Sequence, residues 1–218
     1  MKYNMLIACP EFSTKKYPGA RWYQEGNVQD KEGEEGTIQQ RNHWSFDAVN
    51  HIVAAVRART HAKGKVIIFG HSAGGQFMHR YSLLDGRADV DAIVCANAGW
   101  FTMPDDTTCY PYGTKGLGLS DADLASAFAL PVIMLMGSED VSREQPFRAT
   151  PEADAQGKNR MERCLHYFDA CQKKAEELGV PFNWKKGVVE GAAHEGGKMA
   201  EGAMKLFCEE PLDETVGM

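Results

Sequence analysis

Short apolar runs alternate along the chain with longer stretches in which apolar residues recur every three or four positions. The apolar runs predict strands at Tyr3–Cys9, Val66–Phe69, Ala92–Ala96, Val132–Met136 and Asn183–Val189. The helical spacing predicts helices at His43–Ala62, Gln76–Leu84, Asn159–Leu178 and Lys198–Cys208. Apolar strands alternating with helices are typical of a mostly parallel sheet with helices on both faces. We therefore expect an α/β fold, and the length favours a single domain over residues 1–218.

Composition and charge argue against several classes of binding partner. The chain is 43% hydrophobic and 25% charged, with a formal net charge of −6, which argues against nucleic acid or an anionic membrane as the main partner. No apolar run approaches the roughly 20 residues that a membrane span needs. The first residues, MKYNMLIACP, lack a signal-peptide pattern, so we expect a cytoplasmic protein, or a secreted one if an upstream segment is missing. The six cysteines show neither CxxC spacing nor a Cys/His cluster, so we expect no metal and no cofactor.

A glycine-flanked serine stands where the second predicted strand meets a helix. Residues 70–74 read GHSAG, directly after Val66–Phe69 and before Gln76–Leu84. A serine hydroxyl is a poor nucleophile, and a sharp strand-to-helix turn exposes it beside a base and beside backbone amides. Ser72 is therefore the candidate nucleophile, with the Ala73 amide as an oxyanion donor. The alternative is a glycine-rich turn with an incidental serine.

The candidate acid and base follow later strands. Glu139 and Asp140 lie in the stretch GSEDVS that follows Val132–Met136, and His194 lies in a glycine-rich loop after the last predicted strand. Because the carboxyl ends of parallel strands share one edge of the sheet, these side chains are expected near Ser72. We predict that His194 is the general base and that Asp140, rather than Glu139, orients its imidazole.

Several stretches resemble one family of α/β-hydrolases. They are ACPEFSTKKYPGARWYQEGNV (8–28), FGHSAGGQFMHR (69–80), CANAGWFTMP (95–104), MGSEDV (136–141) and GAAHEGG (191–197). Together they resemble the poly(3-hydroxybutyrate) depolymerase-like esterases. The resemblance implies an α/β-hydrolase fold and ester hydrolysis with Ser72 as nucleophile, Asp140 as acid and His194 as base. It does not specify a polymer as the substrate.

Members of that family carry further strands upstream, so the resemblance implies a sheet shortened at its N-terminal side. Direct pairing of Tyr3–Cys9 with Val66–Phe69 would place the following turn beside Ser72. We therefore predict that the amide of Glu11 or Phe12 supplies a second oxyanion donor. If the pairing does not form, an exposed sheet edge is left, through which the chain could form a homo-oligomer.

Aromatic residues mark a candidate substrate pocket. Trp100 and Phe101 follow the third predicted strand, and Trp22 and Tyr23 lie in a long loop able to reach the same edge. The alternative is that these rings pack in the core. Two function classes remain open. One is a serine esterase acting on a small-molecule or oligomeric ester, and the other is a catalytically weak or inactive hydrolase-fold protein that binds a ligand.

Overall fold

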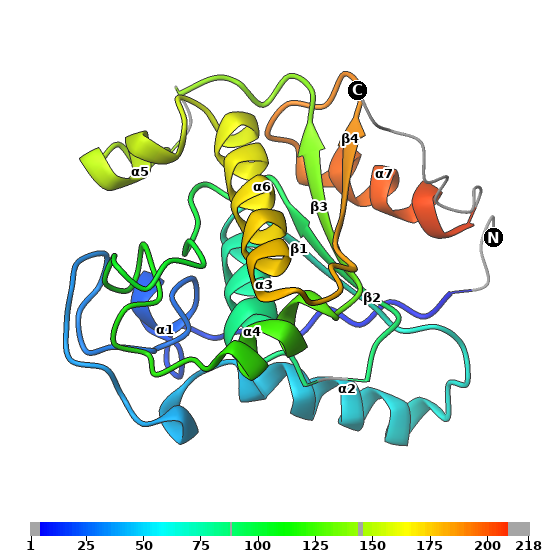
Figure 1. Ribbon diagram of the computed structural model, residues 1–218. Coiled ribbons are helices and arrows are strands. Elements are labelled where there is room, and N and C mark those ends of the chain that lie inside the picture. The colour runs from blue at the N-terminus through cyan, green and yellow to red at the C-terminus, as the bar shows by residue number, and fades with distance from the viewer. Residues whose placement is uncertain (1–4, 88, 144–145, 209–218) are drawn as a thin grey trace.

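Four parallel strands form the central sheet of the computed structural model, which describes residues 5–87, 89–143 and 146–208. The strands lie in chain order: β1 (Ile67–His71), β2 (Ala92–Ala96), β3 (Val132–Gly137) and β4 (Lys185–Val189). Each of these strands is within a few residues of its predicted position. Because all the strands run in parallel, their carboxyl ends meet at one edge, which we call the rim (Figure 1).

Side chains of the strands alternate between two hydrophobic clusters, as the pleat requires. In β2, Ile93 and Cys95 face one cluster, whereas Ala92, Val94 and Ala96 face the other. The same alternation continues in β3 and gives both strands an apolar residue at every position. A strand covered on both faces needs this composition. The α/β prediction is therefore confirmed.

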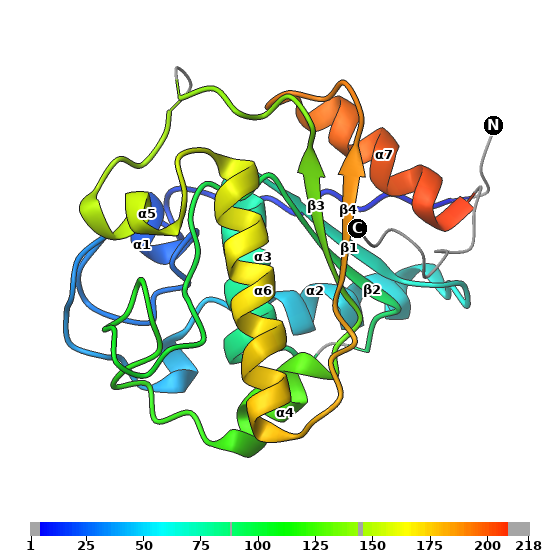
Figure 2. The ribbon, with the colours of Figure 1, turned by 45° about the horizontal axis from the view of Figure 1, so that its top comes forward.

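Helices cover both faces of the sheet (Figures 1 and 2). The first face packs against α3 (Ala73–Leu84) and α6 (Arg160–Leu178), and the second against α7 (Gly196–Cys208). The short helix α4 (Asp121–Phe128) packs against α3 and α6 and adds to the same hydrophobic cluster. The remaining helices are α1 (Gly19–Trp22), η1 (Arg41–His43), α2 (Asp47–Thr60) and α5 (Pro151–Gln156). Neither α1 nor α5 was predicted, because elements of four and six residues are too short to show a helical period. Within the described residues, no helix combines the length and the apolar character needed to cross a membrane.

The first predicted strand is a correction. Tyr3 and Asn4 lie outside the described residues, and Met5–Cys9 forms no strand and does not pair with β1. Instead, Leu6 and Ile7 are 57% and 76% exposed. Pro10 has no amide proton for a ladder. Beyond it, the Phe12 ring packs against Phe77 of α3 and so draws the segment toward that helix rather than along β1.

The two edge strands of the described sheet differ in character. Along β4, Lys185, Lys186 and Val188 are exposed, and charged edge residues discourage pairing with another chain. Along β1, Ile67 to Phe69 are apolar and only half-buried. The predicted alternative of an unpaired β1 edge is thus what the described residues show.

Candidate active site

Ser72 occupies a strained turn between β1 and α3. Its φ of 55° lies in the left-handed region that a side chain rarely adopts, and its amide donates to the Ala96 carbonyl at 2.9 Å. The turn is tight enough to require glycine on both sides. A Cβ on Gly70 would lie 2.4 Å from the Gly74 carbonyl oxygen, and one on Gly75 would lie 2.6 Å from the Ala96 oxygen. The backbone therefore holds the serine hydroxyl out at the rim.

The three predicted side chains meet at this rim. His194 Nε2 lies 2.8 Å from Ser72 Oγ, and His194 Nδ1 lies 2.7 Å from Asp140 Oδ2. The carboxylate is 3% exposed and the imidazole 17%, so the hydrogen bonds are largely shielded from water. Because an ionised carboxylate only accepts hydrogen bonds, Nδ1 carries the proton, and Nε2 is then free to accept from the serine hydroxyl. The geometry thus fixes the tautomer that a general base requires.

Two loops are joined so that Asp140 and His194 meet. The Glu139 amide donates to the Ala192 carbonyl at 2.9 Å, and the Gly191 amide donates to Ser138 Oγ at 2.9 Å. The contact is close enough that a Cβ on Gly137 would lie 2.3 Å from the Ala192 oxygen. The order of the strands places the loops after β3 and β4 side by side, and these bonds fix their relative position.

Asn97, which the sequence analysis did not select, ties the same loops to β2. Its Oδ1 accepts from the Gly137 amide at 2.8 Å, and its Nδ2 donates to the Ala193 carbonyl at 3.1 Å. The residue has a positive φ of 46°, a conformation that asparagine tolerates better than most residues. A polar residue directly after a fully apolar strand is a sequence signal that could have identified it.

A second histidine borders the site. The His71 ring lies 4.7 Å from the His194 ring, centroid to centroid. Burial, and then the neighbouring His194 and Arg160, lower the pKa of His71 to about 4, against the opposing effect of Asp140. His71 is therefore neutral at physiological pH, and it adds no positive charge beside His194.

The Asp140 carboxylate has a second partner that the sequence analysis missed. Arg160, in the first turn of α6, donates from Nη1 to Asp140 Oδ1 at 3.1 Å, and both side chains are only 3% exposed. One carboxylate oxygen therefore faces an arginine and the other faces the histidine. Nothing in the spacing of Asp140 and Arg160 indicates this pair, because it depends on how the loop after β3 folds back onto α6.

Two of the predicted pocket residues are core residues, which corrects that part of the prediction. Trp100 is 3% exposed, and its ring lies 4.2 Å from the Arg80 guanidinium and 4.9 Å from that of Arg148. Phe101 is fully buried and stacks on Tyr167 at 4.6 Å. Both rings point into the molecule below the rim, so neither lines an open pocket.

Trp22 and Tyr23 are half-buried, and of the two Tyr23 reaches the turn at Ser72. Its ring stacks on Phe77 at 5.3 Å, and its hydroxyl would lie 3.3 Å from a Cβ on Gly74. The Trp22 ring lies 4.8 Å from the Arg21 guanidinium. Phe12 also packs on Tyr23, at 5.0 Å, so the segment that carries Glu11 and Phe12 passes beside the start of α3 even though it forms no strand.

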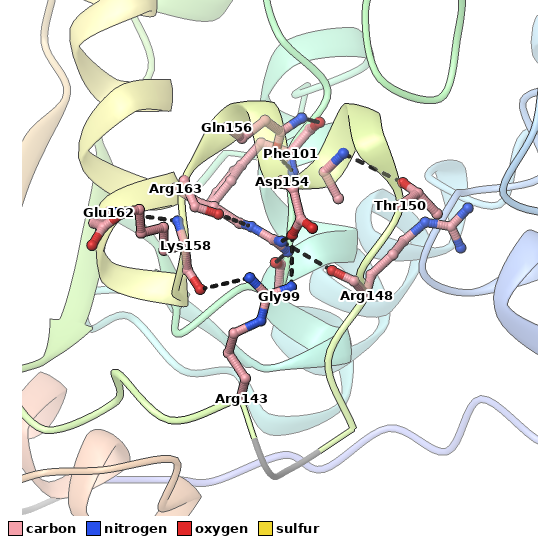
Figure 3. Close-up of polar contacts among 12 residues, drawn as sticks. Gly99, Phe101, Arg143, Arg148, Thr150, Asp154, Gln156, Lys158, Glu162 and Arg163 are labelled. Carbon is pink, nitrogen blue, oxygen red and sulfur yellow. Dashed lines mark hydrogen bonds and ion pairs between the residues drawn. The ribbon is translucent and has the colours of Figure 1, made fainter.

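Buried arginines hold the loops behind the rim, and Figure 3 shows Arg148 and Arg163 with their hydrogen-bond partners. Arg163 of α6 is fully buried and donates to the carbonyls of Gly99, Arg148 and Gly157 at 2.7 to 2.9 Å, and to the Asp154 carboxylate at 2.9 Å. These bonds join the loop after β2 to α5 and to the loop after β3. We use the name arginine cluster for Arg80, Arg148 and Arg163.

A parallel sheet with helices on both faces and a Ser–His–Asp arrangement at the carboxyl ends of its strands defines the class of α/β-hydrolases. Comparison with solved structures gives the particular family. Poly(aspartic acid) hydrolase-1 from Sphingomonas sp. KT-1 matches with 36% identity and a TM-score of 0.82, over 90% of this chain and 74% of that one. LpqC, a poly(3-hydroxybutyrate) depolymerase from Bordetella parapertussis, matches with 34% identity and a TM-score of 0.81, over 90% of this chain and 66% of that one.

The chain belongs to the α/β-hydrolase family that contains these two proteins. The resemblance seen in the sequence is thus confirmed, and the chain spans about two thirds to three quarters of its relatives' lengths. No family model matched the chain, and the search of curated proteins also found no match.

Proposed function

We propose that this protein is a serine hydrolase that cleaves carboxylic esters through an acyl-enzyme at Ser72. The observation that carries the proposal is the continuous hydrogen-bonded path from Ser72 Oγ through His194 to Asp140. Hydrolases on the same fold, at more than 30% identity, support it. The strained backbone at Ser72 supports it as well, because strain of this kind is kept where a reactive side chain must be presented.

In the first half-reaction, Ser72 Oγ attacks the ester carbonyl carbon while His194 Nε2 takes the serine proton. A tetrahedral intermediate forms, and the imidazolium that results is stabilised by its Nδ1–H bond to Asp140. When the intermediate collapses, the bond to the alkoxide breaks and His194 returns the proton to the departing alcohol. Water then attacks the acyl-serine with the same assistance, and the carboxylic acid leaves.

The negative charge on the intermediate needs backbone donors. The Ala73 amide is the first donor, because it opens α3 and the first amides of a helix lack partners within that helix. We propose the amide of Glu11 or Phe12 as the second donor. The packing of Phe12 on Phe77, four residues after Ala73, supports this role. Without a second donor the rate would fall by about 10²- to 10³-fold.

The names of the relatives suggest two substrate chemistries. One relative is a hydrolase of poly(aspartic acid), and the other is a depolymerase of poly(3-hydroxybutyrate). The net charge of −6 favours a neutral ester over a polyanion, which the protein as a whole would repel. We therefore propose a neutral ester as the substrate class. Hydrolysis of poly(aspartic acid) is the second candidate because of the 36% identity with that enzyme.

Labelling with a fluorophosphonate tests the nucleophile, with Ser72→Ala as the control. We expect covalent modification of the wild-type protein and none of the variant. A folded wild-type protein that takes up no label would overturn the proposal and would support a hydrolase-fold binding protein. Rates on p-nitrophenyl acetate to decanoate, on a 3-hydroxybutyrate oligomer and on poly(aspartic acid) then separate the substrate classes.

A further inference from the structure

We propose that Arg160 is a positioning residue of the active site, which holds Asp140 in place beside His194 and offsets part of the negative charge that faces the imidazole. This inference rests on the proposed function, because it concerns the same site. Its own evidence is the buried contact between Arg160 and Asp140, which the hydrolase mechanism does not require.

The contact leaves the carboxylate little freedom to rotate. Oδ1 of Asp140 accepts from Arg160 at 3.1 Å, while Oδ2 accepts from His194 at 2.7 Å. Arg160 is itself held, since its Nη2 donates to the Pro146 carbonyl at 2.8 Å and its guanidinium lies 5.2 Å from the Phe147 ring. The arginine thus joins α6, the loop after β3 and the acid of the site.

The place of Arg160 on its helix also points to a role in the site. It is the first residue of α6, directly after the N-cap Asn159, where the helix macrodipole disfavours a positive charge. A buried guanidinium in that position depends on a carboxylate, and Asp140 is the carboxylate that it contacts. The pair is therefore explained by the needs of Asp140 rather than by the stability of the helix.

The charges around the base give the expected direction of the effect. His71 lies against the imidazole from the end of β1, Arg160 faces Asp140 from α6, and Glu139 precedes Asp140 in the same loop. At the start of α7, Glu195 and Lys198 are exposed and pair with each other at 2.7 Å. The Arg160 charge offsets part of the negative charge that stabilises a protonated His194. We therefore expect a variant that lacks this charge to need a higher pH for full activity.

Three variants separate the charge of Arg160 from its shape and from the general stability of the loop. Arg160→Met removes the charge. Arg160→Lys keeps the charge but cannot bond Asp140 and the Pro146 carbonyl together through the two arms of a guanidinium. Arg163→Met is the matched control, since Arg163 lies one turn further along α6, is equally buried and anchors the same loop without touching Asp140. The measurement is the pH dependence of kcat/KM and of kcat on a p-nitrophenyl ester.

For Arg160→Met we expect the acid limb of the pH profile to move to higher pH by about one unit, because the positive charge of the guanidinium is lost. We also expect kcat to fall by about 10- to 100-fold with KM little changed, because a loosened base costs rate rather than binding. Arg160→Lys should lower kcat without moving the limb, and Arg163→Met should leave the limb in place. An unmoved limb in Arg160→Met, an equal movement in Arg163→Met, or a wild-type kcat in Arg160→Lys would overturn the inference.

A spectroscopic readout separates this inference from the proposed function. In Ser72→Ala, which turns nothing over, NMR titration of His194 in ¹⁵N-histidine-labelled protein reports its protonation, with His194→Ala for assignment. We expect Arg160→Met to move that titration to higher pH in the Ser72→Ala background. If the protein proves not to be a hydrolase, this shift still supports the coupling of Arg160 to His194 through Asp140. If the protein is a hydrolase and the titration does not move, only the role of Arg160 fails.

Discussion

The rim and the arginine cluster both bury charged groups, but they neutralise them in different ways. At the rim, one oxygen of the Asp140 carboxylate accepts from Arg160 and the other from His194. A change at Arg160 can therefore alter the reactivity of His194. In the arginine cluster, Arg163 is surrounded mainly by backbone carbonyls, and Arg80 contacts the Gln24 and Gln76 carbonyls and the Thr102 hydroxyl. Carbonyls hold a cation in place without titrating, so that region supports the loops rather than the chemistry.

The largest expected effect comes from removing the charge at the centre of the rim. Asp140→Asn keeps the size of the side chain but can present an amide donor to His194 Nδ1, which favours the wrong tautomer. We expect kcat to fall by about 10⁴-fold, as loss of the acid does in comparable triads. Arg160 would also lose its carboxylate, so the free energy of unfolding should fall by about 3 to 5 kcal/mol. Steady-state kinetics and urea denaturation measure the two effects, and a variant with wild-type kcat would remove Asp140 from the mechanism.

In the arginine cluster the effect should be on stability alone. Arg163→Met leaves the carbonyls of Gly99, Arg148 and Gly157 without their donors and Asp154 without one of its cations. We expect a loss of about 3 to 5 kcal/mol in the free energy of unfolding, because breaking a buried hydrogen-bonded charge is costly. The kcat per folded molecule should change by less than about tenfold, far below the effect expected of Asp140→Asn. A drop as large as that of Asp140→Asn would show that the two regions do not work separately.

The sequence predicted the two central strands most directly, because they are buried on both faces. β2 and β3 are apolar at every position, so the run itself marks a strand. The same signal failed at Met5–Cys9, because an apolar run does not reveal whether a neighbouring strand is there to pair with it. The sequence predicted that Ser72, Asp140 and His194 meet because parallel topology brings strand ends together whatever the details of the loops. Trp100 was misassigned because its place after a strand does not fix the direction of its ring.

Arg160 and Asn97 show the limit of this reasoning more clearly. Each makes its contact through a loop that folds back across the rim. Arg160 and Asp140 are 20 residues apart in the sequence, and Asn97 and Ala193 are 96 apart. Asn97 at least stands at the end of a strand, where residues of an active site are expected in a parallel sheet. Arg160 stands at a helix start that is unfavourable for a cation, which is a sequence signal only in hindsight.

Removing the Asn97 side chain should have an intermediate effect on kcat. Asn97→Ala removes the bonds to the Gly137 amide and the Ala193 carbonyl, so the His194 loop can shift relative to Asp140. We expect kcat to fall by about 10²-fold, because a displacement of the base of about 1 Å is enough for such a loss. The free energy of unfolding should fall by about 1 to 3 kcal/mol from the buried groups left unpaired. Asn97→Asp is the informative second variant: it restores an acceptor for the Gly137 amide but not the donor to Ala193, and so should recover only part of the rate.

The smallest effect concerns pH and two histidines, the fully buried His79 beside the arginine cluster and the half-buried His71 at the rim. His79 is fully buried beside the arginine cluster, where Nε2 accepts from the Thr102 amide at 3.1 Å and Nδ1 therefore donates to the Gly75 carbonyl at 3.3 Å. Burial, and then the charge of Arg80, hold its pKa well below the ordinary value of 6.5, and burial brings the pKa of His71 to about 4. Below pH 6.5 the unfolded chain therefore takes up protons that the folded chain does not.

It follows that the free energy of unfolding decreases as the pH falls from about 6.5 toward 4, by at most about 1.4 kcal/mol per pH unit for each histidine. The contribution of His71 should be the smaller, because it is partly exposed and water screens its environment. Urea denaturation at several pH values between 7.5 and 4.5 measures the slope, and His79→Gln and His71→Gln assign it. We expect His79→Gln to flatten the slope more than His71→Gln does. The reverse order would mean that the rim, rather than the arginine cluster, is the region that resists protonation.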